Sequence, residues 1–328
     1  MGVWRSLDEV PTDLGRSVVT IGNFDGVHLG HRHVIAQARE AAERFGAARV
    51  IAVTFDPHPI AVLRPEHAPP TLTDIDQRVG LLTEAGVDDV LVLPFTRTMA
   101  DWSPEHFVST VLVDALHATG VVVGVNFRFG KRAAGDLALL LEQGKQQAEG
   151  KTFLTEGIPL DGGPMVWSST YIRTCLAAGD VEGAAEALGR PVSVRGVVQR
   201  GDSRGRELGF PTANVPTSSN AAVPADGVYA GSLRVLDQAD PDDIDDPMPA
   251  AISVGVNPTF AGERNRRVEA YVIDGAGADG GDLDLYDREV EVVFVQRLRG
   301  TLRFESVDDL VAAMRDDVDR AREVLGSP

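Results

Sequence analysis

Residues 17–31 read SVVTIGNFDGVHLGH, and they join a predicted strand to a predicted helix through a glycine-rich turn. The apolar run Ser17–Ile21 is typical of a buried strand, and the amphipathic pattern of residues 31–45 is typical of a helix. Glycines let the turn approach a ligand closely, and the start of a helix offers unpaired N–H groups and a positive dipole end. The stretch therefore predicts a phosphate site.

The imidazoles of His28 and His31 can meet a charged oxygen from one side of this turn. The turn has no good nucleophile, so we expect positioning and charge stabilisation rather than a covalent intermediate. Taken as an isolated pair, these histidines favour a role in capping the helix or in packing. A metal site is disfavoured, because no cysteine or carboxylate cluster nearby completes four ligands.

The composition limits the class of protein. A chain of 328 residues, 43% of them hydrophobic, is long enough for about two domains with cores of their own. Its formal net charge of −18 argues against nucleic-acid binding, which needs a basic surface. No run has the length of a membrane span. The single cysteine, Cys175, excludes an internal disulfide and fits a cytoplasmic location. The oligomeric state is left open.

The first half of the chain, residues 1–187, alternates apolar strand patterns with helical patterns. Strands are expected at 18–21, 50–55, 90–93 and 121–125, and helices at 31–45, 74–85 and 104–116. Short apolar strands separated by helices indicate a parallel sheet covered on both faces. We expect a doubly wound, Rossmann-like α/β domain with ligand sites at the carboxyl ends of its strands.

The second half, residues 188–328, lacks long helices until its end. Strands are expected at 192–198, 227–236, 250–256, 267–273 and 289–295, and this pattern predicts a small antiparallel barrel or sandwich. Ser306 can cap a final helix ending near residue 325, whose apolar stripe is expected to pack on the sheet. The segment 237–249, with six aspartates and three prolines, is interpreted as a solvated loop.

Three more stretches of the first half end strands or begin helices. Prolines in the segment 55–59 can aim Asp56 and His58 from a strand end. The segment 124–131 lacks the Walker spacing, but Asn126 and Arg128 can reach a nucleotide. The hydroxyl of Ser169 can bind phosphate at a helix start or simply cap that helix.

These four stretches together resemble the adenylyltransferase module of the bacterial bifunctional riboflavin kinase/FAD synthetases, a branch of the nucleotidylyltransferase superfamily. The resemblance implies attack by the phosphate of FMN on the α-phosphate of ATP, giving FAD and pyrophosphate, with Mg²⁺ bridging phosphate oxygens. It implies catalytic roles for His28 and His31. It also implies contacts to ATP or FMN from Asn23, Asp25, Asn126, Arg128, Ser169, Thr170 and Arg173.

The string G-x-x-x-G-R-x-x-G-F-P-T-A-N at residues 201–214 resembles the riboflavin kinase module of the same enzymes. The resemblance implies that Glu269 takes the proton of the ribityl hydroxyl as it attacks the γ-phosphate of ATP. Thr212 and Asn214 would hold Mg²⁺. ATP and flavin would contact Gly201, Arg204, Gly205, Gly209, Pro211 and Arg297. Strand alternation puts Glu269 on the face opposite Val268 and Ala270.

The sequence thus predicts an enzyme that converts riboflavin to FMN and then to FAD with two molecules of ATP. Its expected partners are riboflavin, FMN, FAD, ATP, ADP and pyrophosphate, with no nucleic acid and no membrane. The alternative is a single-activity FMN adenylyltransferase whose second domain binds flavin or regulates the first. An intact set of Thr212, Asn214 and Glu269 argues against that alternative.

Overall fold

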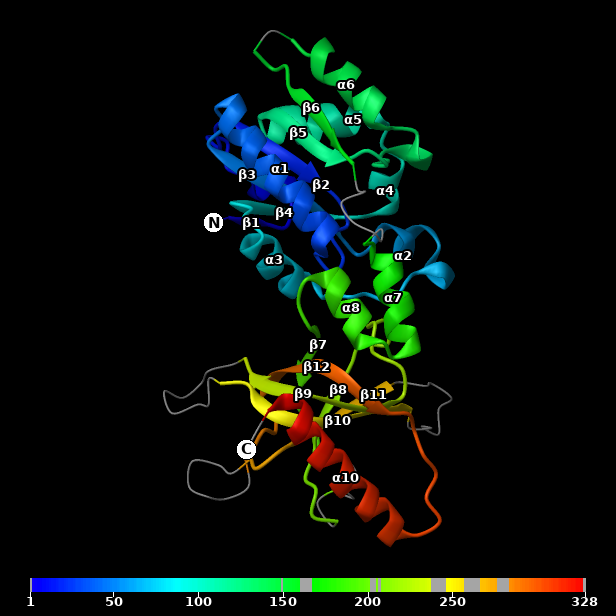
Figure 1. Ribbon diagram of the computed structural model, residues 1–328. Coiled ribbons are helices and arrows are strands. Elements are labelled where there is room, and N and C mark those ends of the chain that lie inside the picture. Colours follow the sequence, from blue (N-terminus) through cyan, green and yellow to red (C-terminus); the bar gives the residue numbers. More distant parts are fainter. Residues whose placement is uncertain are drawn as a thin grey trace. The chain divides into compact units, whose positions relative to one another are not determined.

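The chain is seen in a computed structural model, which describes residues 2–148, 150–159, 167–200, 205, 208–236, 246–256, 266–275 and 283–326. Contacts between Cα atoms divide the chain into two compact units, Met1–Ser169 and Thr170–Pro328 (Figure 1). The functional boundary expected near residue 187 stays a prediction. No helix among the described residues is both long and apolar enough to cross a membrane.

The first unit is a six-stranded parallel sheet in the order β1-β4-β3-β2-β5-β6. Its strands are β1 (Val3–Trp4), β2 (Ser17–Ile21), β3 (Arg49–Asp56), β4 (Asp89–Pro94), β5 (Ala118–Gly124) and β6 (Leu154–Ile158). Its helices are α1 (Leu29–Phe45), α2 (Pro59–Leu63), α3 (Ile75–Glu84), α4 (Arg97–Ala100), α5 (Pro104–Phe107) and α6 (Leu137–Gln146), with a π-helical segment, η3 (Val108–Ala115), after α5. All five residues of β2 are buried, because apolar side chains cover both faces of the sheet. The predicted doubly wound α/β fold is confirmed.

The second unit is an antiparallel six-stranded barrel in the order β7-β12-β9-β10-β11-β8. Its strands are β7 (Val192–Val197), β8 (Ala213–Pro216), β9 (Gly227–Val235), β10 (Met248–Val256), β11 (Arg266–Val272) and β12 (Glu289–Arg299). Its helices are α8 (Val181–Leu188) and α10 (Val307–Leu325), together with α7 (Ser169–Ala178), whose first residue is the last of the first unit. The N–H of Gln199 donates to the carbonyl of Asn214 at 2.9 Å, which brings the two outer strands together. The predicted barrel with a C-terminal helix is confirmed.

Helix α10 begins as the sequence predicts. The hydroxyl of Ser306 accepts the N–H of Asp309 at 3.1 Å and donates to its carboxylate at 2.6 Å. Val318 and Ala321 are buried against the barrel, while Val307, at the start of the predicted stripe, is 61% exposed. The acidic segment at 237–245 lies outside the described residues.

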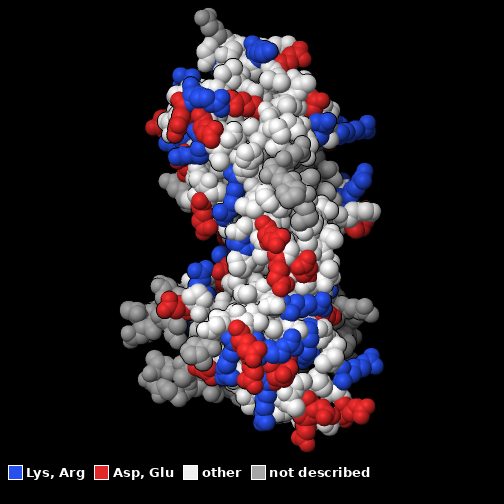
Figure 2. Space-filling view, viewed as in Figure 1, with Lys and Arg blue, Asp and Glu red and all other residues white. Residues whose placement is uncertain are grey.

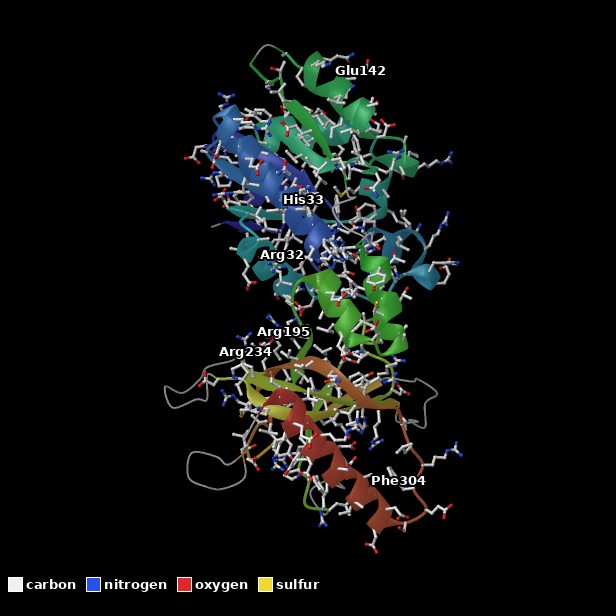
Figure 3. The ribbon with its side chains drawn as sticks, viewed as in Figure 1. Arg32, His33, Glu142, Arg195, Arg234 and Phe304 are labelled. Atoms are coloured by element: carbon white, nitrogen blue, oxygen red, sulfur yellow. The ribbon has the colours of Figure 1, made fainter. Side chains whose placement is uncertain are left out.

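Glu291 joins three strands of the barrel. It lies opposite Arg195 of β7 and Arg234 of β9, and its carboxylate pairs with them at 3.1 and 2.7 Å. Figure 3 labels both arginines. Burial favours a higher pKa for Glu291, but the two guanidinium groups and the hydroxyl of Ser193 outweigh it and hold the pKa below its usual value.

We expect Glu291→Gln to destabilise the barrel at pH 7 and to lose that effect in acid. Because the pKa of Glu291 is lower in the folded protein, its stabilisation is complete above the unfolded-state pKa of about 4.3. It disappears as pH falls through the folded-state pKa. Urea unfolding of both proteins between pH 7 and pH 3 measures the difference. Glu289→Gln, at an exposed position of the same strand, is the control. If the difference in unfolding free energy between wild type and Glu291→Gln does not change with pH, the lowered pKa of Glu291 is contradicted.

Candidate active sites

The glycine-rich turn follows β2 at the point where the order of the strands reverses. From β2 the chain continues to β3 on one side, whereas β5 lies on the other side of β2 and continues to β6. In such sheets a crevice forms between the carboxyl ends of the two central strands, and ligands bind there. Asn23 follows β2 and Asn126 follows β5, so both predicted residues lie at this crevice.

The two predicted histidines lie side by side at the start of α1. His28 is the N-cap, and its Nδ1 accepts the N–H of His31 at 3.4 Å. Their rings stack with centroids 3.6 Å apart. Burial above all, and then the charges of His28 and Arg78, hold the pKa of His31 well below its usual value. His31 is therefore neutral at neutral pH in the free protein, and a phosphate nearby would favour its protonated form.

Asp25 and Ser169 hold the glycine-rich turn in place. The carboxylate of Asp25 is buried, and it accepts the N–H groups of Leu72 and Thr73 at 3.0 and 3.1 Å. The hydroxyl of Ser169 donates to the backbone carbonyl of Asp25 at 2.8 Å. These two predicted residues thus fix the backbone beside the histidines. Thr170 and Arg173 follow on α7, within the second unit.

A cavity of about 1150 Å³ lies beside the turn. Asn23, Asn126 and Arg128 line it, and the amide of Asn23 is 3.2 Å from the imidazole Nε2 of His58, in the proline-rich segment after β3. Its aromatic lining comes from Phe55, Phe95, Trp102, Phe107, Phe127 and Phe129. The cavity therefore offers flat apolar surfaces close to the glycine-rich turn.

Positive charge gathers around the same cavity. Arg64, Arg97, Arg128 and Arg132 are exposed on its lining and form no ion pair within the part of the chain that the structure describes. Asp101 is the one acidic side chain that lines it, and Lys131 pairs with Asp101 at 2.8 Å. Elsewhere, acidic and basic side chains are interspersed on the face shown in Figure 2. In a chain of net charge −18, this local excess of arginine suits an anionic ligand.

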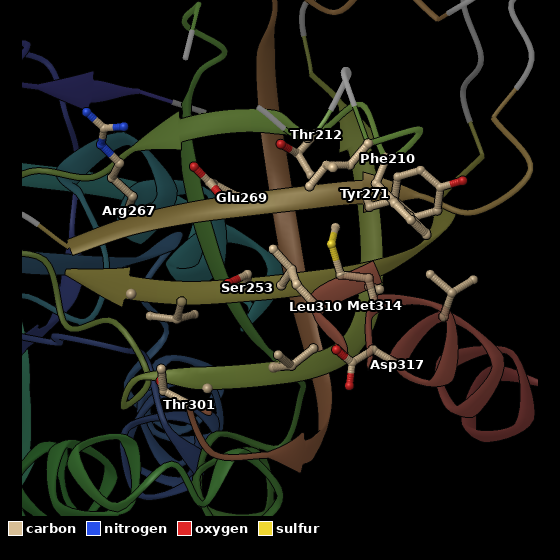
Figure 4. Close-up of a pocket in the computed structure, with 18 of the residues that line it drawn as sticks. Phe210, Thr212, Ser253, Arg267, Glu269, Tyr271, Thr301, Leu310, Met314 and Asp317 are labelled. Atoms are coloured by element: carbon tan, nitrogen blue, oxygen red, sulfur yellow. The ribbon is translucent and has the colours of Figure 1, made fainter. Parts of the chain in front are cut away.

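In the second unit, three polar residues form a row across adjacent strands. Asn214 of β8 lies opposite Glu269 of β11, and Glu269 lies opposite Ser253 of β10. Val268 and Ala270 are fully buried, so Glu269 is on the other face of the strand, as predicted. The row lines a cavity of about 470 Å³, which Thr212 also lines (Figure 4).

The oxygen of the Asn214 side chain is buried without a hydrogen-bond partner among the residues that the structure describes. This residue is 8% exposed, and its Oδ1 accepts no hydrogen bond from the described residues. A buried amide oxygen and a threonine hydroxyl from residues that line one cavity suit a hard cation that also binds water and phosphate. Among the described residues, no group of three or more His, Cys, Asp or Glu could hold a metal instead.

The predicted glycine loop is described in part. Gly205 and Pro211 line the cavity, and Gly209 has a φ of +85°, a conformation that favours glycine. Gly201 and Arg204 lie outside the described residues.

Helix α10 supplies part of the apolar lining of this second cavity. Leu310 and Met314 line it, and Figure 4 shows them facing the strands that carry Glu269 and Ser253. Asp317 of α10 accepts two hydrogen bonds from Arg299 of β12, at 2.8 and 2.6 Å.

Arg297, the predicted flavin contact, is not among the residues that line the cavity. Its guanidinium donates instead to the carbonyls of Ala178 and Asp226. Arg299, two residues further on, lines the cavity.

Both units match families of known proteins. The profile of the FAD synthetase family matches residues 10–158, and that of the riboflavin kinase family matches residues 188–325. The bifunctional riboflavin kinase/FMN adenylyltransferase of Escherichia coli K12 is 36% identical, over 94% of this chain and 93% of its own length. The protein of that name from Pseudomonas fluorescens is 37% identical, over 100% and 99%.

This chain belongs to the bifunctional riboflavin kinase/FMN adenylyltransferase family. Its two cavities lie one in each unit, and both family activities use ATP as a co-substrate. A solved structure titled as a macrolide-efflux protein from Streptococcus pneumoniae has a TM-score of 0.82 and 28% identity, and covers 98% of each chain. The fold described above therefore recurs in that protein along nearly its whole length.

The sequence did not single out Arg78, which is 3% exposed and lies next to Asp25. In the sequence, Arg78 is one charged residue of an amphipathic helix. Its partners Asp25 and Phe55 lie far from it in sequence, so no local pattern indicates their contact.

Proposed function

We propose that this chain phosphorylates riboflavin in the second unit and adenylylates the resulting FMN in the first. The observation that carries the proposal is that Thr212 and Asn214, from the glycine-rich motif, line one cavity together with Glu269 of β11. That convergence supports a working kinase site over the alternative of a flavin-binding or regulatory domain. We place the boundary between the activities near residue 187, and a cytoplasmic location fits the need for ATP and the single cysteine.

In the kinase reaction, Glu269 accepts the proton of the ribityl 5′-hydroxyl as that oxygen bonds to the γ-phosphorus of ATP. The bond from this phosphorus to the β,γ-bridging oxygen breaks, and ADP leaves. Thr212 Oγ1 and Asn214 Oδ1 would hold Mg²⁺, and an amide oxygen that accepts no hydrogen bond from the described residues supports this assignment. When bound, this cation neutralises charge on the phosphates. Gly201, Arg204, Gly205, Gly209 and Pro211 are proposed to contact ATP or flavin.

The apolar half of the same cavity is proposed to hold the flavin ring. Tyr271, Leu310 and Met314 offer a surface that a planar ring can cover. The pair between Arg299 and Asp317 fixes α10 against β12 and so fixes this wall. Arg297 is proposed to affect flavin binding indirectly, because its guanidinium binds the carbonyls of Ala178 and Asp226.

In the adenylylation, an oxygen of the FMN phosphate bonds to the α-phosphorus of ATP, and pyrophosphate leaves with the electrons of the broken bond. His28, His31 and the start of α1 are proposed to stabilise the charge on the phosphates. Contacts to ATP or FMN are proposed for Asn23, Asn126, Arg128, Thr170 and Arg173. Asp25 and Ser169 are proposed to contribute by holding the turn.

The cavity of the first unit is proposed to receive FMN. Its aromatic side chains can cover an isoalloxazine ring. The arginines at its rim favour a flavin that carries a phosphate over riboflavin, which is uncharged. The two units would therefore differ in flavin selectivity, because the kinase must accept the uncharged form.

Incubation of the purified chain with riboflavin, ATP and Mg²⁺ tests the proposed function. We expect FMN to appear first and FAD to follow, when flavins are separated over time. Conversion that stops at FMN would contradict the site in the first unit. Failure to convert riboflavin, while supplied FMN is still adenylylated, would favour the single-activity alternative.

We expect His31→Ala to lower FAD formation from FMN by roughly 10²–10³, the usual effect of removing one stabilising donor. Riboflavin phosphorylation should not change, because that site lies in the other unit. His33→Ala, at an exposed position on the same helix (labelled in Figure 3), is the matched control and should retain both activities. Normal FAD formation by His31→Ala would leave His31 as a packing residue.

We expect Glu269→Gln to lower riboflavin phosphorylation by roughly 10²–10⁴, the usual contribution of a positioned general base. The amide keeps the size of the side chain but cannot accept the proton. Adenylylation of supplied FMN should persist, and the exposed Glu289→Gln should retain both activities. Near-normal phosphorylation by Glu269→Gln would show that another group or water takes the proton.

A further inference from the structure

Arg78 and Asp25 form a buried ion pair beside the glycine-rich turn. Their side chains are 4% and 2% exposed, and Arg78 Nη2 is 3.6 Å from Asp25 Oδ1. A buried charge is stable only when a partner and hydrogen bonds replace its water. The hydrogen bonds that Arg78 and Asp25 make therefore identify the segments that this ion pair holds together.

The guanidinium of Arg78 connects three segments that are distant in sequence. It donates to the carbonyl of Phe55, at the end of β3, at 3.3 Å, and to the carbonyl of Thr73 at 3.1 Å. It pairs with Asp25 in the turn after β2. Arg78 itself belongs to α3. One planar cation thus joins the turn, the end of the neighbouring strand and the segment before α3.

Asp25 and Thr73 complete this connection. The carboxylate of Asp25 accepts the N–H groups of Leu72 and Thr73. In the opposite direction, the N–H of Gly26 donates to the hydroxyl of Thr73 at 3.1 Å. The turn and the segment 72–73 are therefore bound to each other by both backbone and side-chain groups.

The turn needs such support because its backbone is strained. Phe24 and Val27 have φ values of +48° and +39°, and positive φ is an outlier for a bulky or β-branched residue. Both side chains are buried. Phe24 also packs edge-on against His31, with centroids 5.2 Å apart. The conformation of the turn consequently sets where the imidazoles lie.

We infer that Arg78 is a positioning residue for adenylyl transfer. Through Asp25 and the segment 72–73, it holds the turn that carries His28 and His31 in the conformation that meets the phosphates of ATP. Arg78 touches no substrate in this role. The inference rests on the proposed adenylylation of FMN in the first unit.

The test compares Arg78→Gln and Arg78→Lys with wild type in the full chain, with kcat and KM measured for each activity. Arg78→Gln should lower kcat for FMN adenylylation by about 10²-fold, because a displacement near 1 Å can have that effect. KM for ATP should change far less, and riboflavin phosphorylation should not change. The kcat of Arg78→Lys for FMN adenylylation should lie between those of wild type and Arg78→Gln, because one ammonium keeps the charge but cannot reproduce the geometry of the guanidinium fork.

Arg49 provides a matched control. It pairs with Asp89 at 2.7 Å in the same unit. Both residues begin their strands, β3 and β4, and so lie at the end of the parallel sheet opposite the turn. Arg49→Gln should leave kcat for FMN adenylylation within about twofold of wild type, as expected for a residue remote from the site. Equal losses in the Arg49 and Arg78 variants would overturn the inference, and so would wild-type kcat in Arg78→Gln.

Thr73 keeps the inference testable if Arg78→Gln does not fold. Thr73→Val removes the hydroxyl that binds Gly26 while keeping the shape of the side chain, and it should lower kcat for FMN adenylylation by roughly 10-fold. Thr73→Ser keeps the hydroxyl and should have a kcat for FMN adenylylation close to that of wild type. Equal kcat for these two variants would overturn the inference. A wild-type chain that does not adenylylate FMN would reject the proposed function instead.

Discussion

A carboxylate that is removed from water must find donors within the protein, and the candidate site of the first unit depends on how Asp25 does so. Its donors are the N–H groups of Leu72 and Thr73, and its charge partner is Arg78. These contacts hold a strained turn between the central strand and α1. The contacts to phosphate proposed for the two imidazoles and the start of α1 would therefore need no rearrangement of the turn, and preorganised groups of this kind stabilise charge most effectively.

The second site depends on the register of an antiparallel barrel. Because side chains alternate along each strand, Glu269 faces the cavity while Val268 and Ala270 fill the core. Register then aligns Asn214, Glu269 and Ser253 across three strands. The carboxylate proposed as the base therefore lies in one row with the polar side chains of Asn214 and Ser253, in a cavity that α10 also lines.

Much of this organisation could be predicted from sequence, because periodicity reports burial. The central strands and α1, α3 and α10 were predicted within a few residues of their observed bounds. β1 was missed because it has two residues, β6 because Leu154–Ile158 includes Glu156 and Gly157, and β8 because four residues inside a motif give no period. Phe107–Ala115 lies within the predicted helix at 104–116, but it is π-helical from Val108 onward.

The residues that position the sites were harder to predict. Arg78 acts on Asp25 and Phe55, which are distant in sequence, so no local pattern marks it. Arg297 and Arg299 are two residues apart and should share a face of an ideal strand. The pairing of β12 with β9 shifts register between them, and such an irregularity redirects side chains in a way that alternation cannot reveal.

The central claim is that one chain transfers two different parts of ATP to one flavin. The most direct measurement supplies riboflavin as the sole flavin, with ATP labelled at either the γ- or the α-phosphorus, and then splits the FAD product at its pyrophosphate bond into FMN and AMP. The account predicts γ-label in the FMN half and α-label in the AMP half. An FMN half without γ-label, or an AMP half without α-label, would contradict it.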